Sequence, residues 1–315
     1  MLFRSQSRTL ALLLAVILAA ADLASAMETD QFTTPRMPMH DIGSALSGKI
    51  ADILESDRTG RDPEVVLSEW AGHNIFRSRL GRWVSDLSAT DGLARYLPKA
   101  FDSIYRWVFS PVPLSFLFDS PTVRVHGFYM GTDKVDHFFQ QGYDYYQDVM
   151  RGRSEGRDVE AAVAAAVAHG VKQEHTYYGT AVSGIYSNGD LAANYAGMKF
   201  YRNLRHPVRI GDATHAPMFQ KTPEGWRLRP GADPARLLEP FLSNHLDESL
   251  NPNRYRFSRK SLRSTIRKRC AQWTQFYSDR LDFVAPAGKS FAAKWFGEEY
   301  GYWLPPAQEV SIATE

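Results

Sequence analysis

The chain has 315 residues, and its 37 basic and 35 acidic side chains leave a formal net charge of +2. A balance this close to neutral argues against a dedicated nucleic-acid-binding protein. With 13% aromatic residues and a single cysteine, Cys270, the composition is that of a globular protein without an intrachain disulfide. We therefore expect the core to be stabilised by packing.

The first 26 residues have the three parts of a cleavable signal peptide. Two arginines form a basic n-region, residues 10–21 form an apolar h-region, and Ala-Ser-Ala at 24–26 is a small-x-small cleavage site. We expect a mature chain that starts at Met27 and is exported to the periplasm or cell envelope of a bacterial-type cell. The alternative is an uncleaved N-terminal anchor, but Asp22 interrupts the apolar run.

Apolar residues recur at helical spacing over much of the mature chain. In chain order, the spacing predicts helices over 42–56, 63–73, 76–88, 91–109, 132–150, 158–178 and 188–204. Pro111 and Pro113 end the fourth of these. Thr132 and Ser187 are suitable N-terminal caps for the fifth and the last. Residues 122–128 alternate, as in a short strand or an extended lead into the next helix.

The chain after residue 205 has a different pattern. Residues 219–228 read as a hairpin around Thr-Pro-Glu-Gly at 222–225, because proline in second and glycine in fourth place suit a type I turn. Helices are expected over 233–248 and 258–280. The predicted fold is mainly α, a helical domain with a central three-helix unit and a minor β-hairpin. Its parts are a signal peptide (1–26), a helical domain (27–205) and a C-terminal extension packed on the same domain (206–315).

Polar side chains recur on all three central helices, which span 132–204. Asp133 and His137 are four residues apart and share a helix face, as do Asp190 and Asn194. Glu174 lies on the helix between them. Small residues at four-residue spacing let a neighbouring backbone approach closely, so we expect the polar groups to converge. The candidate site residues are Asp133, Lys134, His137, Glu174, Asp190, Asn194 and Gly197.

Each of these residues also has an ordinary structural explanation. Asp133 can complement the positive end of its own helix. Asp190 stands three residues after Ser187, as in a capping box. His137 and Glu174 can form a buried ion pair. Whether the cluster is structural or functional is left open by the sequence.

Three sequence segments together resemble a known family. They are Gly-Thr-Asp-Lys-Val-Asp-His-Phe at 131–138, then Glu174, then Ser-Asn-Gly-Asp-Leu-Ala-Ala-Asn-Tyr-Ala-Gly at 187–197. The order D-K-x-x-H-F, E, S-x-x-D-L-x-A-N-x-x-G is similar to the VanZ-like family and to related small periplasmic proteins and lipoproteins of unknown function. The resemblance covers about 132–200.

The resemblance implies a helical, envelope-associated protein. VanZ-like proteins are typically embedded in the membrane, and some are linked to glycopeptide-antibiotic resistance. This sequence departs from them because no apolar run after the signal peptide reaches transmembrane length. That departure argues against a resistance role.

Two functions are compatible with the cluster, and the sequence does not decide whether the protein is an enzyme. The first is a structural or binding role in the cell envelope. The second is a metal-assisted hydrolase acting on an envelope substrate. In the second, His137, Glu174 and Asp190 would bind one divalent ion, and Asp133 would orient the imidazole. No other cofactor is expected.

A basic segment near the C-terminus offers a possible partner. Between 254 and 269 there are eight basic residues and no acidic one, beside a rough apolar stripe. Such a segment can bind an anionic membrane surface. The alternative is a helix packed on the domain with its basic face in water. The eight residues are Arg254, Arg256, Arg259, Lys260, Arg263, Arg267, Lys268 and Arg269.

Overall fold

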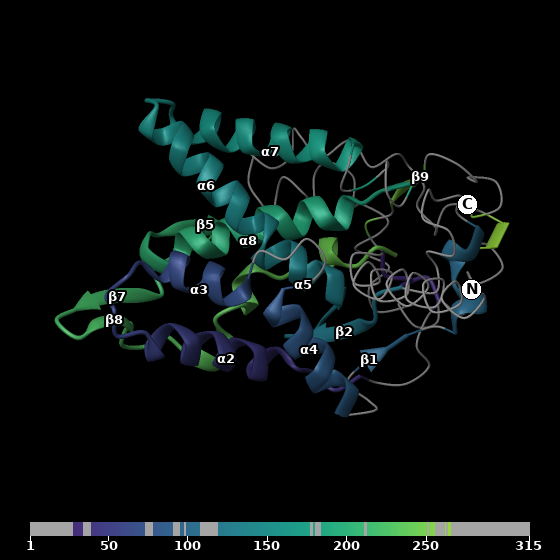
Figure 1. Ribbon diagram of the computed structural model, residues 1–315, viewed down its shortest axis with the longest axis horizontal. Coiled ribbons are helices and arrows are strands. Elements are labelled where there is room, and N and C mark those ends of the chain that lie inside the picture. Colours follow the sequence, from purple (N-terminus) through teal and green to yellow (C-terminus); the bar gives the residue numbers. More distant parts are fainter. Residues whose placement is uncertain are drawn as a thin grey trace, which may run out of the picture.

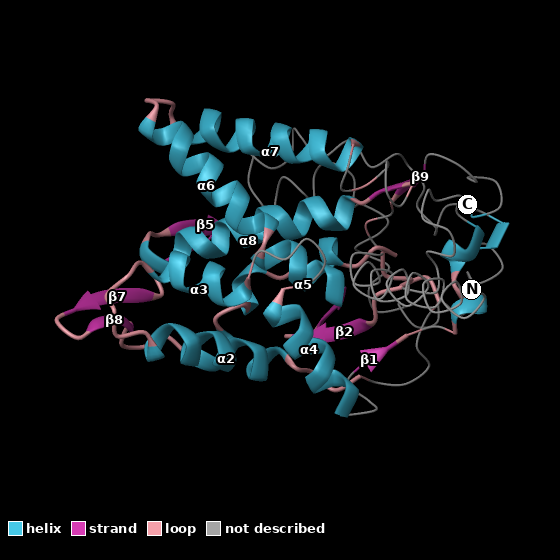
Figure 2. Cartoon of the chain, in the orientation of Figure 1, coloured by secondary structure: helices cyan, strands magenta, loops and turns pink. Residues whose placement is uncertain are grey.

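The computed structural model describes residues 28–33, 39–72, 78–90, 95–97, 99–107, 119–176, 179, 184–210, 213–249, 251, 253–255, 262 and 264–265. Over these ranges the chain forms seven α-helices and several antiparallel sheets of two or three short strands (Figures 1 and 2). The mainly α fold with minor β structure is thus confirmed. No helix in the described ranges is both long and apolar enough to cross a membrane.

The helices pack around α8, which lies in the middle of the structure (Figure 1). Every residue of α8 except Arg202 and Arg205 is buried. It contacts α3, α5, α6 and α7, and α6 also packs along α7. The helices are α2 (Gly43–Ser56), α3 (Pro63–Ala71), α4 (Arg79–Thr90), α5 (Thr132–Phe139), α6 (Gln141–Ser154), α7 (Val159–His175) and α8 (Asn188–Arg205).

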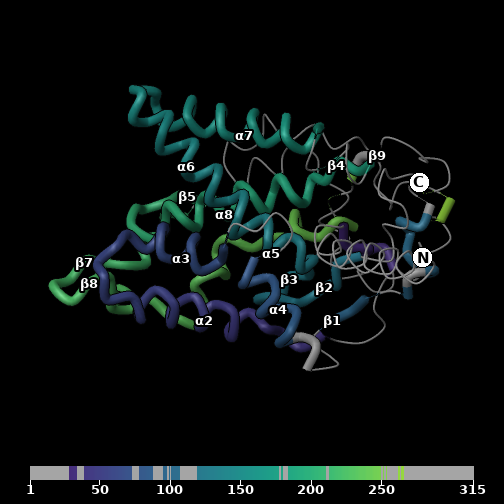
Figure 3. The backbone as a smooth tube through the Cα atoms, viewed as in Figure 1, coloured from purple at the N-terminus to yellow at the C-terminus, as the bar shows by residue number. Residues whose placement is uncertain are grey.

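Within the described residues, the strands form four small antiparallel sheets. One has the order β1-β2-β3, and the others pair β4 with β9, β5 with β6 and β7 with β8. β4 and β9 are far apart in the sequence but lie side by side (Figure 3). The strands are β1 (Arg95–Tyr96), β2 (Thr122–Val125), β3 (Phe128–Gly131), β4 (Ile185–Tyr186), β5 (Val208–Ile210), β6 (Ala213–His215), β7 (Phe219–Thr222), β8 (Gly225–Leu228) and β9 (Arg254–Tyr255).

Both segments predicted to form β structure contain strands joined by a turn. The predicted hairpin over 219–228 is confirmed as β7 and β8. The segment 122–128, expected to be one extended stretch, ends as a strand at Val125. A turn at His126 and Gly127, whose φ angles are 47° and 86°, joins this strand (β2) to β3. The Asp41 carboxylate accepts hydrogen bonds from the amides of both turn residues, at 2.8 and 2.5 Å, and so holds this turn.

The helix predicted over 132–150 is interrupted. α5 ends at Phe139, and Gln140, with φ −93° and ψ −70°, separates it from α6. α6 then continues to Ser154, beyond the predicted end at residue 150. Thr132 is not a cap: α5 begins at Thr132, and the preceding Gly131 provides no side chain. Ser187 does cap α8, because its Oγ accepts the Asp190 amide at 3.1 Å.

The helix predicted over 91–109 is wrong. The described part of this range contains β1 and two 3-10 helices, η1 (Ala100–Asp102) and η2 (Ile104–Trp107). Pro98 lies inside the predicted helix, where it removes an amide donor and disfavours helical geometry at Leu97. In addition, the Asp30 carboxylate accepts the Ile104 amide at 2.9 Å, which satisfies that donor outside an α-helix.

The helix predicted over 233–248 is also wrong. Three separate 3-10 helices, η4 (Pro234–Arg236), η5 (Glu239–Phe241) and η6 (Asn244–Leu246), occupy this range. Pro240 cannot donate a helical hydrogen bond. Ser243 is extended, and its Oγ caps η6. Most of the helix predicted over 258–280 lies outside the described residues.

A close crossing of α5, α6 and α8 depends on two glycines. A methyl group on Gly197 of α8 would lie 2.0 Å from the Phe138 carbonyl oxygen, and one on Gly142 of α6 would lie 2.7 Å from the Gly197 Cα atom. Both are backbone contacts, which cannot move aside as a flexible side chain can. The expected close approach at Gly197 is therefore present.

We predict that Gly197→Ala destabilises the protein by about 1–3 kcal/mol, because the methyl group forces these helices apart. Gly48→Ala in α2 is the matched control. Nothing lies within 4 Å of a methyl group there, so removing backbone freedom should stabilise the protein by about 0.5–1 kcal/mol. Urea unfolding measures both. Equal effects of the two substitutions would contradict the packing argument.

Candidate functional site

Lys134, in the first turn of α5, is completely buried among acidic side chains. Its Nζ atom donates hydrogen bonds to Asp133 Oδ2 at 2.6 Å and to Glu248 Oε1 at 2.5 Å. It also forms ion pairs with Asp190 Oδ1 at 2.6 Å and with Glu28 Oε2 at 3.7 Å. An ammonium has three N–H donors, and three carboxylate oxygens lie within 2.6 Å of this one.

The charge of Lys134 is held by these neighbours. Burial alone would lower the pKa of the amine, but the carboxylates of Asp133, Asp190 and Glu248 outweigh burial and hold it well above its usual value. The pKa values of the Glu28 and Glu248 carboxyl groups are shifted by the same surroundings. Burial, together with the other nearby carboxylates, raises the pKa of both.

Four separate parts of the chain meet at this cluster. Asp133 and Lys134 open α5, Asp190 lies in the first turn of α8, Glu248 follows η6, and Glu28 belongs to the segment 28–33. Each carboxylate therefore fixes one part of the chain to the ammonium. The arrangement requires contacts between residues that are more than 100 positions apart.

Neutral groups complete the cluster. Thr29 Oγ1 donates to Asp133 Oδ1 at 2.7 Å. Tyr105 OH and Asn253 Nδ2 donate to Glu248 Oε2 at 2.5 and 2.9 Å. Buried carboxylates need such donors, because an unpaired charge is costly to bury.

His137 lies one turn further along α5 and is bonded through both ring nitrogens. Nε2 is 3.1 Å from Asp190 Oδ2, and Nδ1 is 3.1 Å from Asn194 Oδ1. Both partners are acceptors as assigned, so the arrangement suits a ring protonated on both nitrogens. Burial lowers the pKa of His137, but Asp190 outweighs it and raises the pKa to about 9. Burial in turn raises the pKa of Asp190, but His137 and Lys134 hold it well below its usual value.

Glu174, in the last turn of α7, is buried at the edge of this network. Its Oε1 accepts the backbone amide of Ser187 at 2.9 Å, so it secures the start of α8. Burial, reinforced by the charge of Asp190, raises the pKa of Glu174 to about 8. No hydrogen bond joins Glu174 to His137 within the described ranges, although each affects the pKa of the other.

The structure therefore brings most of the candidate residues together. The four-residue spacing in the sequence predicted which residues share a helix face, but not which of them contact one another across helices. Direct contacts link Asp133, Lys134, Asp190, His137 and Asn194 in series. Glu174 interacts with them electrostatically, and Gly197 makes the helix crossing one turn beyond Asn194.

The capping explanation accounts for only part of the role of Asp190. Its backbone amide is capped by Ser187, whereas its side chain turns to Lys134 and His137. Likewise, the Asp133 side chain is bonded to Lys134 and to Thr29, in addition to its place at the start of α5.

Sequence reasoning missed Glu28, Thr29, Tyr105 and Glu248. Asp247 and Glu248 are fully buried, although adjacent acidic residues in a sequence are usually exposed to solvent. Neither the residues just after the predicted signal peptide nor this acidic pair has a partner at helical spacing in the sequence. The one local signal in the sequence is the acidic residue Glu28 close to the predicted cleavage site, and an acidic residue alone does not indicate a buried position.

Four of these carboxylates meet a geometric condition for holding a metal ion. Glu28, Asp133, Asp190 and Glu248 each offer an oxygen within 4.8 Å of the others. However, the Lys134 ammonium lies among the same oxygens and takes the place of a cation. The predicted metal ligands were different: of His137, Glu174 and Asp190, only His137 and Asp190 are in direct contact. That metal site stays a prediction.

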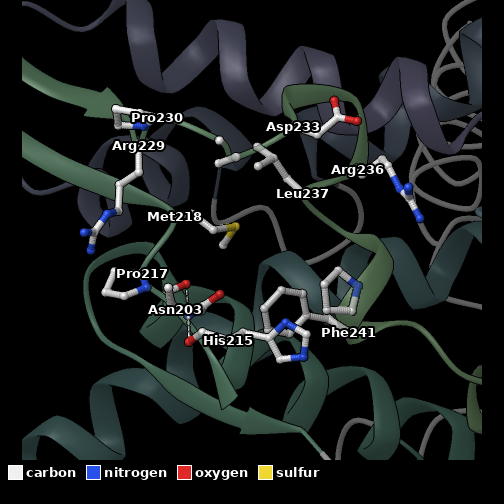
Figure 4. Close-up of a pocket in the computed structure, with 14 residues that line it drawn as sticks. Asn203, His215, Pro217, Met218, Arg229, Pro230, Asp233, Arg236, Leu237 and Phe241 are labelled. Atoms are coloured by element: carbon white, nitrogen blue, oxygen red, sulfur yellow. Dashed lines mark hydrogen bonds between the residues drawn. The ribbon is translucent and has the colours of Figure 1, made fainter. Parts of the chain in front are cut away.

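A cavity of about 510 Å³ lies elsewhere, between the end of α8, the β6–β7 connection and η5 (Figure 4). Met218, Leu237 and Phe241 give it apolar walls, and Arg229 points outward at its edge. Three backbone carbonyls lie within hydrogen-bond distance of Asn203 Nδ2 in its wall, so both N–H donors of this amide are already engaged. The volume is that of a small-molecule site, but none of the candidate residues lines it.

Comparison of the chain with protein-family models gives no match, and searches of curated proteins and of solved structures give none either. The VanZ-like resemblance therefore stays a prediction that rests on the motif residues alone.

We predict that stability falls as pH rises from about 6.5 to 9. The folded pKa values of His137 and Glu174, about 9 and 8, exceed the ordinary values of 6.5 and 4.5. Each native group thus holds its proton more tightly than the unfolded chain does. The stabilisation is complete below the ordinary pKa and is lost as pH passes through the raised one.

Urea unfolding at pH 6.5 and pH 9 measures this change. His137→Gln should reduce the loss of unfolding free energy between the two pH values. His206→Gln, which removes an exposed imidazole just after α8, controls for loss of a histidine and should leave the loss unchanged. An undiminished loss in His137→Gln would contradict the assignment.

Proposed function

We propose that this protein is a non-enzymatic structural or binding component of a bacterial-type cell envelope, exported by its signal peptide. In this proposal the cluster around Lys134 serves to hold the segment 28–33, α5, α8 and residue 248 in one arrangement. The proposal does not depend on the VanZ-like resemblance, although that resemblance agrees with an envelope location.

The observation that carries the proposal is the environment of the Lys134 ammonium. It has no exposed surface, and three carboxylate oxygens lie within 2.6 Å of Nζ. An amine that binds or attacks a substrate needs a free donor or a free electron pair. The raised pKa leaves no free electron pair on the amine, hydrogen bonds to Asp133 and Glu248 engage two of its three donors, and Asp190 Oδ1 lies 2.6 Å from the same nitrogen. Both features favour a structural role.

His137 supports the same conclusion. A general base needs an unprotonated nitrogen near the working pH. Here each ring nitrogen faces an oxygen acceptor, and the pKa of about 9 keeps the ring charged at neutral pH. The imidazolium therefore serves as a donor to Asp190 and Asn194. A binding role, if present, is better supported by the 510 Å³ cavity.

The second candidate is the metal-assisted hydrolase. It is favoured by the four carboxylate oxygens within 4.8 Å of one another, which are suitable ligands for a hard divalent cation. For a divalent cation to bind there, the Lys134 ammonium would have to move away from the carboxylate oxygens or lose its proton. The raised pKa of Lys134 opposes the second route.

Attachment to anionic membranes also remains a proposal. Of the eight basic residues on which it rests, only Arg254 falls within the described ranges, as the first residue of β9. The other seven lie outside them. Co-sedimentation with anionic and neutral vesicles would test the attachment.

We predict that Lys134→Met lowers the free energy of unfolding by about 3–5 kcal/mol, because it strands several buried carboxylates. Adding Glu248→Gln should restore part of the loss, so the two effects should not be additive. Lys172→Met, at an exposed position on α7, is the control and should change stability by about 0.5 kcal/mol or less. Additive losses in the double variant would contradict a network.

Metal analysis separates the two candidate functions. We predict that protein purified without chelators contains far less than one divalent ion per chain, since the Lys134 ammonium already occupies the space among the carboxylate oxygens. Elemental analysis by mass spectrometry measures the content, with Asp190→Asn as a comparison. One ion per chain in the wild type, lost in Asp190→Asn, would favour the hydrolase.

A further inference from the structure

The pocket between the end of α8, the β6–β7 connection and η5 has an apolar interior. Its volume of about 510 Å³ is within the range of small-molecule sites. Met218, Leu237 and Phe241 in its walls are between 2 and 7% exposed, and the Met218 side chain points toward the centre of the pocket (Figure 4). The lining also includes Pro217, Pro230 and Pro240. Because proline has no backbone N–H, this interior suits an apolar group.

Hydrogen bonds fix the walls of this pocket on two sides. On one side, Asn203 Nδ2 lies within 3.2 Å of three backbone carbonyls of the chain between α8 and β7. On the other side, the Ala232 amide donates to the Arg229 carbonyl at 3.0 Å and closes a turn over 229–232. Proline is second in this turn and Gly231, with a φ of 87°, is third, as a type II turn requires. Walls that are already ordered reduce the cost of binding a ligand.

One cation at the mouth of the pocket is available to a ligand. Arg229 is exposed there, and its guanidinium forms no ion pair or hydrogen bond with the part of the chain that the structure describes. Arg236, the other arginine of the lining, is already engaged, because Nε and Nη2 both donate to the Glu239 carboxylate. That hydrogen bond and, more weakly, the charge of the lining residue Asp233 raise the pKa of Arg236. The acidic groups of this rim therefore act on Arg236, and the charge of Arg229 stays uncompensated.

We propose that this pocket binds a small amphipathic carboxylate, with its apolar body in the interior and its carboxylate at Arg229. A guanidinium can donate two parallel N–H bonds to a carboxylate. Because the Arg229 side chain points outward (Figure 4), the carboxylate lies at the mouth in contact with water, and no charge has to be buried. The inference names a ligand class for the binding role that the cavity supports. It does not depend on the Lys134 cluster, since no residue of that cluster lines the pocket.

The test uses two probes of equal chain length, octanoate and octan-1-ol, which differ in charge. The whole protein is labelled with ¹³C at its methionine methyl groups and titrated with each probe at pH 7 and low salt. NMR spectra then report binding at the pocket wall through the Met218 signal, which Met218→Leu identifies. We expect both probes to shift this signal, and octanoate to bind at least about fivefold more tightly, because charge-assisted hydrogen bonds are roughly twice as strong as neutral ones.

Substitutions separate the charge from the apolar interior. Arg229→Gln should weaken octanoate binding to the level of octan-1-ol and leave octan-1-ol binding unchanged. Arg209→Gln, which removes an exposed arginine of β5 outside the pocket, is the matched control and should change neither. Ala232→Phe and Ala216→Phe each place a ring at a lining position and should abolish the binding of both probes. Thermal unfolding confirms that each variant is folded, and both positions are at least partly exposed, so a ring is tolerated there.

Three results would overturn the proposal. Equal binding of octanoate and octylammonium would show that the pocket does not select an anion. Octanoate binding that leaves the Met218 signal unmoved, or that persists in both phenylalanine variants, would place the ligand elsewhere. Loss of the preference for octanoate in His215→Gln but not in Arg229→Gln would place the carboxylate at the imidazole, which also lines the pocket. Failure here leaves the structural role intact, because Lys134→Met tests that role separately.

Discussion

The structure depends on one buried charge, the ammonium of Lys134. A lone ammonium at such depth would cost several kcal/mol or more, so the fold must bring carboxylates to it. Only Asp133 is a neighbour in sequence. The other contributors come from the segment 28–33, from α8 and from the stretch after η6, and each must be in place before the charge is satisfied. The cluster therefore favours one arrangement of these segments over others. Apolar residues of similar volume could stabilise the fold to the same degree, but they would not require these particular segments to meet.

Close backbone packing makes the contact between α5 and α8 possible. The Phe138 carbonyl approaches Gly197 at the crossing, and near the start of α8 a methyl group on Gly189 would lie 2.8 Å from the Lys134 Cε atom. Small residues at both places leave room for the lysine stem and for the opposing helix. The electrostatic and steric requirements thus fall on the same two helices, and larger residues in α8 would move Asp190 away from its partners.

The sequence predicted the local part of this arrangement and missed the long-range part. Asp133 and His137, and Asp190 and Asn194, were identified because helical periodicity places residues four apart on one face. Glu28 and Glu248 have no such relation to α5, since their positions follow from tertiary packing. Similarly, α2 and α7 follow their apolar patterns, whereas the helices predicted over 91–109 and 233–248 fail. In those two ranges prolines and capping side chains satisfy or remove the amide donors that an α-helix would use.

The central position of α8 has a consequence for how the molecule moves. Nearly all of its residues are buried, and it touches four of the other helices. Its interior amides cannot meet solvent through fraying of one neighbour, because the remaining neighbours still cover them. Their hydrogens should exchange with deuterium mainly through global unfolding. The slowest-exchanging amides in α8 would then report the free energy of unfolding of the whole assembly of helices.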